Sequence, residues 1–113
     1  MKYSIIKPDP NLKDNLMAFG IMTEEGWYPL IFECLDKIQE IVDRDNIDIQ
    51  VTEIKEKYGT LRIYLSGYTD EMYDIVYAAE HKSETICEIC GKQGELHKVN
   101  GWWMTRCDEC LEE

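Results

Sequence analysis

The spacing of apolar residues along this 113-residue chain predicts two helices. From Pro29 to about Asp43, apolar side chains recur at intervals of three and four residues, which is the period of one helical face. Proline suits the first turn of a helix, because a missing N–H leaves no intrahelical hydrogen bond unmade there. A second segment of this kind begins after Thr69, whose hydroxyl can cap a helix, and runs to about Ser83.

Between these helices, apolar and polar residues alternate in two runs, with the period of half-buried strands. The first run covers residues 47–51, and Ile54 then falls on the opposite parity, which indicates a bulge or the end of the strand. The second run covers residues 61–65. A glycine-containing turn at residues 57–60 joins the two runs, so we expect an antiparallel hairpin.

These elements predict an α+β fold in which two main helices cover one face of a hairpin or small antiparallel sheet. An N-terminal arm precedes them. Its short apolar patch at residues 3–6 is either an extended arm or an edge strand, and a short helix follows that Asn11 can cap and Gly20 can end. The predicted core consists of the inward-facing apolar positions of these elements. They are Leu30, Leu35, Ile38, Ile49, Val51, Ile63, Leu65, Met72, Ile75 and Val76.

Four cysteines near the C-terminus have the spacing of a metal site. Cys87 and Cys90 form one Cys-x-x-Cys pair, Cys107 and Cys110 form another, and 16 residues separate the pairs. This spacing is typical of a tetrathiolate zinc site. Four protein ligands leave no open coordination position, so we expect a structural Zn²⁺ rather than a catalytic one. A redox dithiol needs only one pair, and the zinc deaminase signature is absent.

The insert between the cysteine pairs predicts a second hairpin. Residues 96–99 and 102–105 flank Asn100-Gly101, a dipeptide that favours a two-residue type I′ turn. We expect a zinc ribbon or a treble-clef-like arrangement, although only three residues remain after Cys110 for the helix of a treble clef. The chain is thus divided into an acidic α+β body with its N-terminal arm, residues 1–85, and a zinc-ribbon module packed on it, residues 86–113.

Composition narrows the classes of partner. A hydrophobic content of 44% predicts a packed core. The chain carries 23 acidic and 12 basic residues and a formal charge of −11, which disfavours nucleic acids and anionic membranes and favours a protein with a basic surface. Acidity that serves only solubility explains the charge equally well. The sequence contains no run of 18 apolar residues, so no membrane span is predicted. The first ten residues lack a secretory signal pattern, so we expect the protein to reside in a reducing cytoplasm.

Two tryptophans on the predicted zinc hairpin are candidates for binding. Trp102 and Trp103 are adjacent on a strand and should point to opposite faces. Packing in the core is favoured over partner binding for each, and the outer tryptophan is the leading candidate for an interaction hot spot. Tyr73 and Tyr77, four residues apart on the second helix, should extend the core, with an exposed aromatic patch as the alternative. Cys34, on the apolar face of the first helix, is expected to be a buried, unreactive thiol.

A local group of basic side chains lies on the predicted body hairpin. It consists of Lys55, Lys57 and Arg62, with Tyr64 beside them. The group can bind an anion such as a nucleotide phosphate, with the tyrosine as a stacking surface. The plainer interpretation is that these exposed strand residues balance Glu53 and Glu56. His81 and His97 are expected to be surface side chains.

Three segments carry a resemblance to a known family. They are residues 55–64, residues 26–29 and the Cys-x-x-Cys-Gly knuckle that begins at Cys87. Over residues 26–110 the chain resembles a family of small uncharacterised bacterial and phage proteins with a C-terminal four-cysteine zinc ribbon. The resemblance implies a bacterial cell or a phage-infected host as the setting, in which short acidic proteins often act by occupying a host protein.

The sequence shows no phosphate-binding glycine-rich loop, no Ser-His-Asp set and no His-Glu-x-x-His motif. We therefore expect a non-enzymatic, acidic, zinc-containing protein, which a phage could encode, that binds and inhibits a host or defence protein with a basic surface. The first alternative is a sponge for a signalling nucleotide, which would bind on the Arg62 and Tyr64 face. The second alternative is a zinc-ribbon protein associated with nucleic acid, which the acidity of residues 80–113 disfavours.

Overall fold

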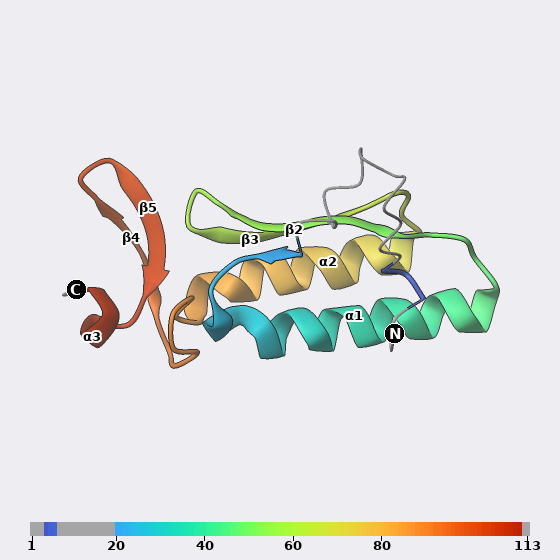
Figure 1. The fold of residues 1–113 in the computed structure, drawn as a ribbon, viewed down its shortest axis with the longest axis horizontal. Helices are drawn as coiled ribbons and strands as arrows, with labels where there is room; N and C mark the ends of the chain where they lie inside the picture. The colour runs from blue at the N-terminus through green and yellow to red at the C-terminus, as the bar shows by residue number, and fades with distance from the viewer. Residues whose placement is uncertain (1–3, 7–19, 112–113) are drawn as a thin grey trace.

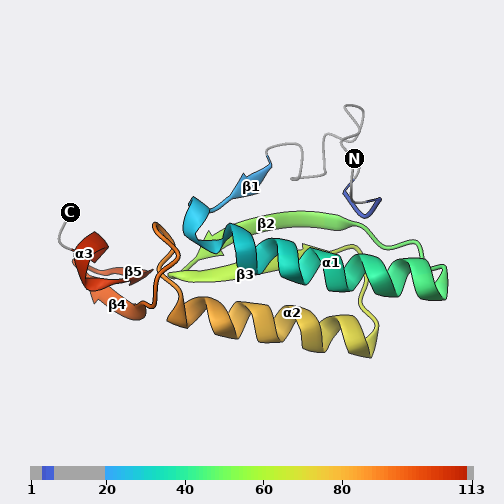
Figure 2. The ribbon, with the colours of Figure 1, turned by 90° about the horizontal axis from the view of Figure 1, so that it is seen from below.

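Two long helices lie side by side against one face of a three-stranded sheet, and a separate two-stranded hairpin stands at one end of this layer pair (Figures 1 and 2). The structure is a computed structural model that describes residues 4–6 and 20–111. This α+β architecture confirms the predicted fold class. The predicted helix after Asn11 lies outside the described residues. No helix in the described part of the chain is long and apolar enough to cross a membrane.

The two helices occupy nearly the predicted spans. Helix α1 covers Tyr28–Asp45, with a proline in its first turn, and ends at Asn46 in a left-handed conformation (φ 54°). Helix α2 covers Asp70–Lys82. The hydroxyl oxygen of Thr69 accepts a hydrogen bond from the Met72 N–H at 3.1 Å, so the predicted N-cap is confirmed. A short 3-10 helix, η3 (Ser83–Thr85), continues α2 toward the cysteines.

The sheet has the order β1-β2-β3. Strand β1 (Ile21–Met22) pairs in parallel with β2 (Val51–Lys57), and β2 pairs in antiparallel with β3 (Thr60–Leu65). The two residues between β2 and β3 are Tyr58 (φ 54°) and Gly59 (φ 82°), as a type I′ turn requires. The predicted hairpin is therefore confirmed.

The start of β2 differs from the prediction. Residues 47–50 precede the strand. Gln50 still contacts Ser66, whose N–H donates to the Gln50 carbonyl at 2.8 Å and whose hydroxyl accepts from the Gln50 N–H at 3.0 Å, but the ladder with β3 begins at the Val51–Leu65 pair. Ile49 is still buried and contributes to the core without strand pairing. The predicted bulge is confirmed: the register shifts between Val51 and Glu53, which turns Ile54 inward, where it is fully buried.

The core lies between the helices and the sheet and contains every predicted member except Ile75, which is half-buried at its edge. Ile75 lines the groove between α1 and α2, so the prediction of a core position was wrong there. Cys34 is buried as predicted, and its burial raises the pKa of the thiol to about 12. Trp27 is fully buried although the sequence analysis did not assign it to the core.

Side chains close the outer edge of β3. Three backbone N–H groups on that edge each donate a hydrogen bond to a side chain from the α2 side, so they are not free to pair with an added strand. The bonds are Leu61 N to Ser83 Oγ (2.9 Å), Ile63 N to Glu80 Oε2 (3.1 Å) and Leu65 N to Tyr68 OH (3.1 Å). A partner that binds by strand addition would have to displace these caps.

Candidate metal centre

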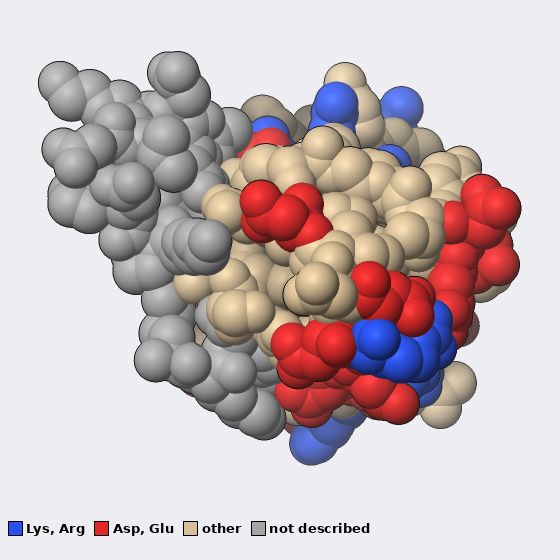
Figure 3. All heavy atoms as spheres, turned by 90° about the vertical axis from the view of Figure 1, so that its right-hand side faces the viewer, with Lys and Arg blue, Asp and Glu red and all other residues tan. Residues whose placement is uncertain are grey.

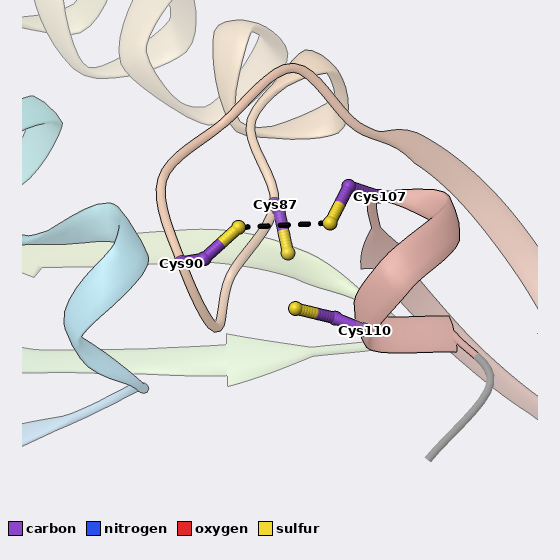
Figure 4. Close-up of side chains that lie close together, drawn as sticks. All are labelled: Cys87, Cys90, Cys107 and Cys110. Atoms are coloured by element: carbon purple, nitrogen blue, oxygen red, sulfur yellow. Dashed lines mark hydrogen bonds between the residues drawn. The ribbon is translucent and has the colours of Figure 1, made fainter.

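The predicted hairpin between the cysteine pairs is present. Strand β4 (Glu95–Val99) pairs with β5 (Trp102–Arg106), and the connecting Asn100 and Gly101 have φ values of 53° and 85°. These positive values define the predicted type I′ turn. The hairpin returns the chain so that the second cysteine pair faces the first (Figure 4).

The four cysteine sulfurs converge on one point (Figure 4). All four Sγ atoms lie within 4.8 Å of one another, and those of Cys90 and Cys107 are 3.6 Å apart. A disulfide bond is about 2.05 Å long, so these sulfurs are not bonded to each other. A tetrahedral site with metal–sulfur bonds of about 2.3 Å has sulfur–sulfur edges of about 3.8 Å. The cluster therefore has the size and donor set to hold a metal ion.

Tight backbone turns position the sulfurs. In the first pair, the Gly91 N–H donates to the Cys87 carbonyl at 2.9 Å, and Gly91 itself has a left-handed φ of 83°. The second pair lies at the start of α3 (Asp108–Leu111), where the Leu111 N–H donates to the Cys107 carbonyl at 3.0 Å. The short helix α3 contains Cys110 and ends one residue after it, at Leu111.

The thiols differ in acidity. Burial raises the pKa of Cys87, but the backbone N–H groups of Cys90, Cys107 and Ile89 outweigh it and lower that pKa to about 6. The hydrogen bond with the Cys107 side chain, together with burial, raises the pKa of Cys110 to about 12. A first thiolate thus forms readily, and further ionisation in the cluster places like charges together unless a cation offsets them.

The knuckle that carries Cys87 packs directly on the entrance to α1. The Gly26 N–H donates to the Glu88 carbonyl at 2.7 Å, and the indole N–H of Trp27 donates to the Ile86 carbonyl at 2.8 Å. Both donors come from the 3-10 helix η2 (Glu25–Trp27). A Cβ added to Gly26 would lie 2.2 Å from the Cys87 carbonyl oxygen, so glycine is required for this approach.

A second contact joins the β2–β3 turn to the β4–β5 hairpin. The buried Thr105 hydroxyl donates to the Gly59 carbonyl at 2.7 Å, and the Thr105 carbonyl accepts from the Glu88 N–H at 3.0 Å. A Cβ on Gly59 would lie 2.7 Å from the Met104 nitrogen. Gly26, Gly59 and Thr105 were all missed as site residues, because their role depends on which segments meet in space.

The two tryptophans are exposed rather than packed in the core. Trp102 is 74% exposed and Trp103 is 41% exposed. The prediction of core packing was wrong, because the two-stranded hairpin stands beyond the helix-covered sheet (Figure 1). Tyr58, at the tip of the neighbouring turn, is 69% exposed. With Glu56 and Gly101, these three aromatic residues line a hollow of about 280 Å³.

The structure keeps two members of the predicted basic group, Lys55 and Arg62, side by side and places Lys57 at the β2–β3 turn. Lys55 and Arg62 are direct cross-strand neighbours. Arg62 reaches a carboxylate oxygen of Glu80 at 3.7 Å, and Lys57 lies over the Tyr58 ring, with its Nζ 5.7 Å from the ring centre. The predicted balance by Glu53 and Glu56 was therefore wrong for Arg62. The Glu56 carboxylate instead accepts from the Gly59 N–H at 2.6 Å.

Tyr64, the fourth member of that group, belongs to an aromatic groove. Tyr73 and Tyr77 on α2 are 61% and 62% exposed, so the prediction that they extend the core was wrong and the aromatic patch is present. The groove has a volume of about 160 Å³ and runs between α2 and β3. His81 is exposed as predicted and stacks on Tyr77, with ring centres 6.2 Å apart, whereas His97 is half-buried on β4.

Comparison of the chain with protein-family models, with curated proteins and with solved structures found no match.

Proposed function

We propose that this chain is a non-enzymatic protein-binding module, in which a structural zinc ion holds an aromatic surface in place for a partner. The observation that carries the proposal is the exposure of Tyr58, Trp102 and Trp103 around one hollow. We call these three residues the aromatic surface. It is formed by two hairpin turns that the metal centre and its contacts with the body hold side by side.

Zinc is the metal that suits the cluster best. It favours tetrahedral coordination by thiolates, and the four cysteines supply a complete set of ligands. A filled set leaves no position for a reactive water, so the ion would contribute folding energy rather than chemistry. The cysteines would bind it as thiolates and orient the hairpin that carries both exposed tryptophans.

The aromatic surface has the composition of a binding hot spot. Tryptophan and tyrosine are enriched where a few residues carry most of an interface's binding energy. Scattered single apolar residues are common on protein surfaces, but here three large exposed aromatic residues from two neighbouring hairpins line one hollow. Such a patch is typical of a surface that another molecule covers.

The charge of the chain supports a basic partner. The formal net charge is −11, and carboxylates gather on the end of the molecule where α1 ends and α2 begins, with a group of basic side chains among them (Figure 3). This end is opposite the aromatic surface (Figure 1). The negative field would steer a basic protein toward the chain, while the aromatic rings would supply the contact. A host or defence protein of the bacterial cell remains the proposed partner.

Affinity capture tests the proposal. Wild-type protein and the Trp102→Ala variant would each be used to capture partners from bacterial lysate, and Tyr73→Ala, which removes another exposed ring, from α2, is the control. We expect a partner that is retained by the wild type and by Tyr73→Ala and lost with Trp102→Ala. Equal recovery with all three proteins, or no partner with any of them, would contradict the proposal.

A second candidate function is the binding of a signalling nucleotide in the aromatic groove. Its support is the position of Arg62 beside the rings of Tyr64, Tyr73 and Tyr77, which can stack on a base. The carboxylate of Glu80 near Arg62 opposes a phosphate there. Calorimetry with a panel of nucleotides tests this candidate, since Arg62→Ala should abolish the heat of binding only if a nucleotide binds at this groove.

A further inference from the structure

We infer that the hollow of the aromatic surface is a cation site, which receives an arginine or lysine side chain from a basic segment of the protein partner. This inference rests on the proposed function and adds the chemistry of recognition. Its three components are a carboxylate in the wall, aromatic rings around the opening, and cations that the chain itself already places on two of those rings.

Glu56 supplies the carboxylate. It lines the hollow with the three rings, and its Oε2 accepts the Gly59 N–H at 2.6 Å, which fixes the side chain at the base of the turn. Within the described part of the chain, its other oxygen takes part in no hydrogen bond or ion pair. An anchored carboxylate with a free oxygen can therefore accept a hydrogen bond from a guanidinium or ammonium group.

The rings favour the same kind of ligand. The face of an aromatic ring is negative, and a cation within about 6 Å of its centre is attracted to it. Lys57 places its Nζ 5.7 Å from the centre of the Tyr58 ring, and Lys98 places its Nζ 5.5 Å from that of Trp103. Lys57 neighbours Tyr58 in sequence and Lys98 lies opposite Trp103 across the strand pair, so these two rings already have a cation beside them.

Trp102 provides the ring that remains for a ligand. It is the most exposed large apolar side chain of the described residues, at 74%, and no ring contact or cation contact within this part of the chain involves it. Tryptophan also attracts cations more strongly than tyrosine or phenylalanine. A cationic side chain could thus lie on Trp102 while its charged end reaches the carboxylate of Glu56.

The hollow fits a side chain better than an anion or a purely apolar group. Its volume of about 280 Å³ accommodates the end of a long side chain. A carboxylate in the wall would repel an anion, and covering it with an apolar group would leave it desolvated and unpaired. The formal net charge of −11 favours the approach of a basic segment from any direction.

Nuclear magnetic resonance of the metal-loaded chain tests the inference directly. The probes are N-acetyl-arginine methylamide, the lysine equivalent, and the citrulline equivalent, which has nearly the shape of arginine but no charge. We expect the arginine and lysine probes to shift the indole N–H signals of Trp102 and Trp103 in a saturable way, while the buried Trp27 signal stays in place. The citrulline probe should cause no saturable shift.

Matched variants assign the effect to the hollow. Glu56→Gln can keep the hydrogen bond to Gly59 but removes the charge, so we expect it to weaken arginine binding about threefold to tenfold. Glu53→Gln, which removes the same charge from a position opposite Tyr64 on the same hairpin, should leave binding unchanged. Trp102→Ala should abolish saturable binding without loss of metal, since the side chain is exposed.

Two outcomes would overturn the inference. Equal shifts with the arginine and citrulline probes would show that the hollow does not recognise charge. An unchanged affinity of Glu56→Gln for the arginine probe would show that the Glu56 carboxylate does not take part in binding. Either result leaves the proposed function intact if Trp102-dependent capture of a protein succeeds. Failure of that capture together with tight binding of tetramethylammonium would indicate a small cationic ligand and would also overturn a side chain as the occupant.

Discussion

The body and the cysteine module of this chain are stabilised by different forces. The apolar core of the described residues is drawn from positions between Ile5 and Ala79. In the described range 86–111, the buried residues are Cys87, Glu88, Gly94 and Thr105, which do not form an apolar core. The body can thus gain stability by removing apolar surface from water, whereas the module needs a metal ion and its contacts with the body.

This difference explains the arrangement around the knuckle. A module without a core of its own is held where two glycines allow close backbone approach, at Gly26 and Gly59, and where the indole of Trp27 and the hydroxyl of Thr105 donate hydrogen bonds across the junction. The body supplies a rigid platform, and the metal would tie together the two cysteine pairs. Changes to the metal, the junction and the core should therefore have distinct effects.

Loss of the metal should have the largest effect. In Cys107→Ser or after chelation, amide hydrogen exchange should become fast throughout residues 86–111, while the protected amides of α1 and β3 stay slow. Binding of zinc to such sites is worth about 10–16 kcal/mol and is largely folding energy. Cys34→Ala is the matched control, because it should destabilise the body and retain the metal. Slow amide exchange in residues 86–111 without metal would contradict the claim that the module, unlike the body, needs the metal ion for its stability.

Gly26→Ala should have the next largest effect, because the new Cβ would lie 2.2 Å from the Cys87 carbonyl oxygen. We expect a loss of about 1–3 kcal/mol in the free energy of unfolding, measured in urea. Gly67→Ala is the control, since its Cβ would meet only the Ile49 side chain, at 4.0 Å. Equal effects of the two substitutions would show that the knuckle does not pack tightly on η2.

Thr105→Val should have an intermediate effect. It keeps the shape of the side chain but removes the buried hydrogen bond to the Gly59 carbonyl, so we expect a cost of about 1–2 kcal/mol in the free energy of unfolding. Thr85→Val removes an exposed hydrogen bond of similar length, to the Lys82 carbonyl, and should cost less than about 0.5 kcal/mol. A smaller loss in Thr105→Val than in Thr85→Val would contradict a role for Thr105 at the junction.

The smallest effect should be a pH dependence from Glu80. Burial raises the pKa of this carboxyl above its ordinary value, against the lowering effects of the Ile63 N–H and Arg62. The folded state then holds this proton to higher pH than the unfolded state, so its contribution to stability falls as pH rises between the two pKa values. Glu80→Gln should flatten the pH dependence of the unfolding free energy between these two pKa values, and the total change should be well under about 1 kcal/mol. An unchanged slope would contradict this assignment.

Local patterns were sufficient to predict the two long helices, the two hairpins and the convergence of the four cysteines, but not the short parallel strand β1. The helices follow from apolar periodicity with a proline and a threonine at their starts, and Asn100-Gly101 identifies its turn because both positions require a positive φ. The cysteine spacing predicts convergence because each pair lies on a tight turn. Each of these signals is contained within a few neighbouring residues.

The errors concern properties that depend on the assembled fold. The exposure of Trp102 could not be read from its strand, because burial depends on whether another layer covers the hairpin. The late start of β2 depends on where its ladder with β3 begins, and the need for glycine at position 26 depends on the approach of the Cys87 backbone. Three segments that are distant in the sequence contribute to the junction between body and module. They are residues 26–29, residues 55–64 and the Cys87 knuckle.

X-ray absorption at the zinc edge of the purified protein is the most direct test of the central claim, that four thiolates enclose one structural ion. We predict one zinc per chain with four sulfur neighbours at about 2.3 Å and no oxygen or nitrogen in the first shell. An oxygen or nitrogen neighbour, another metal at full occupancy, or a metal-free protein with ordered residues 86–111 would contradict the account.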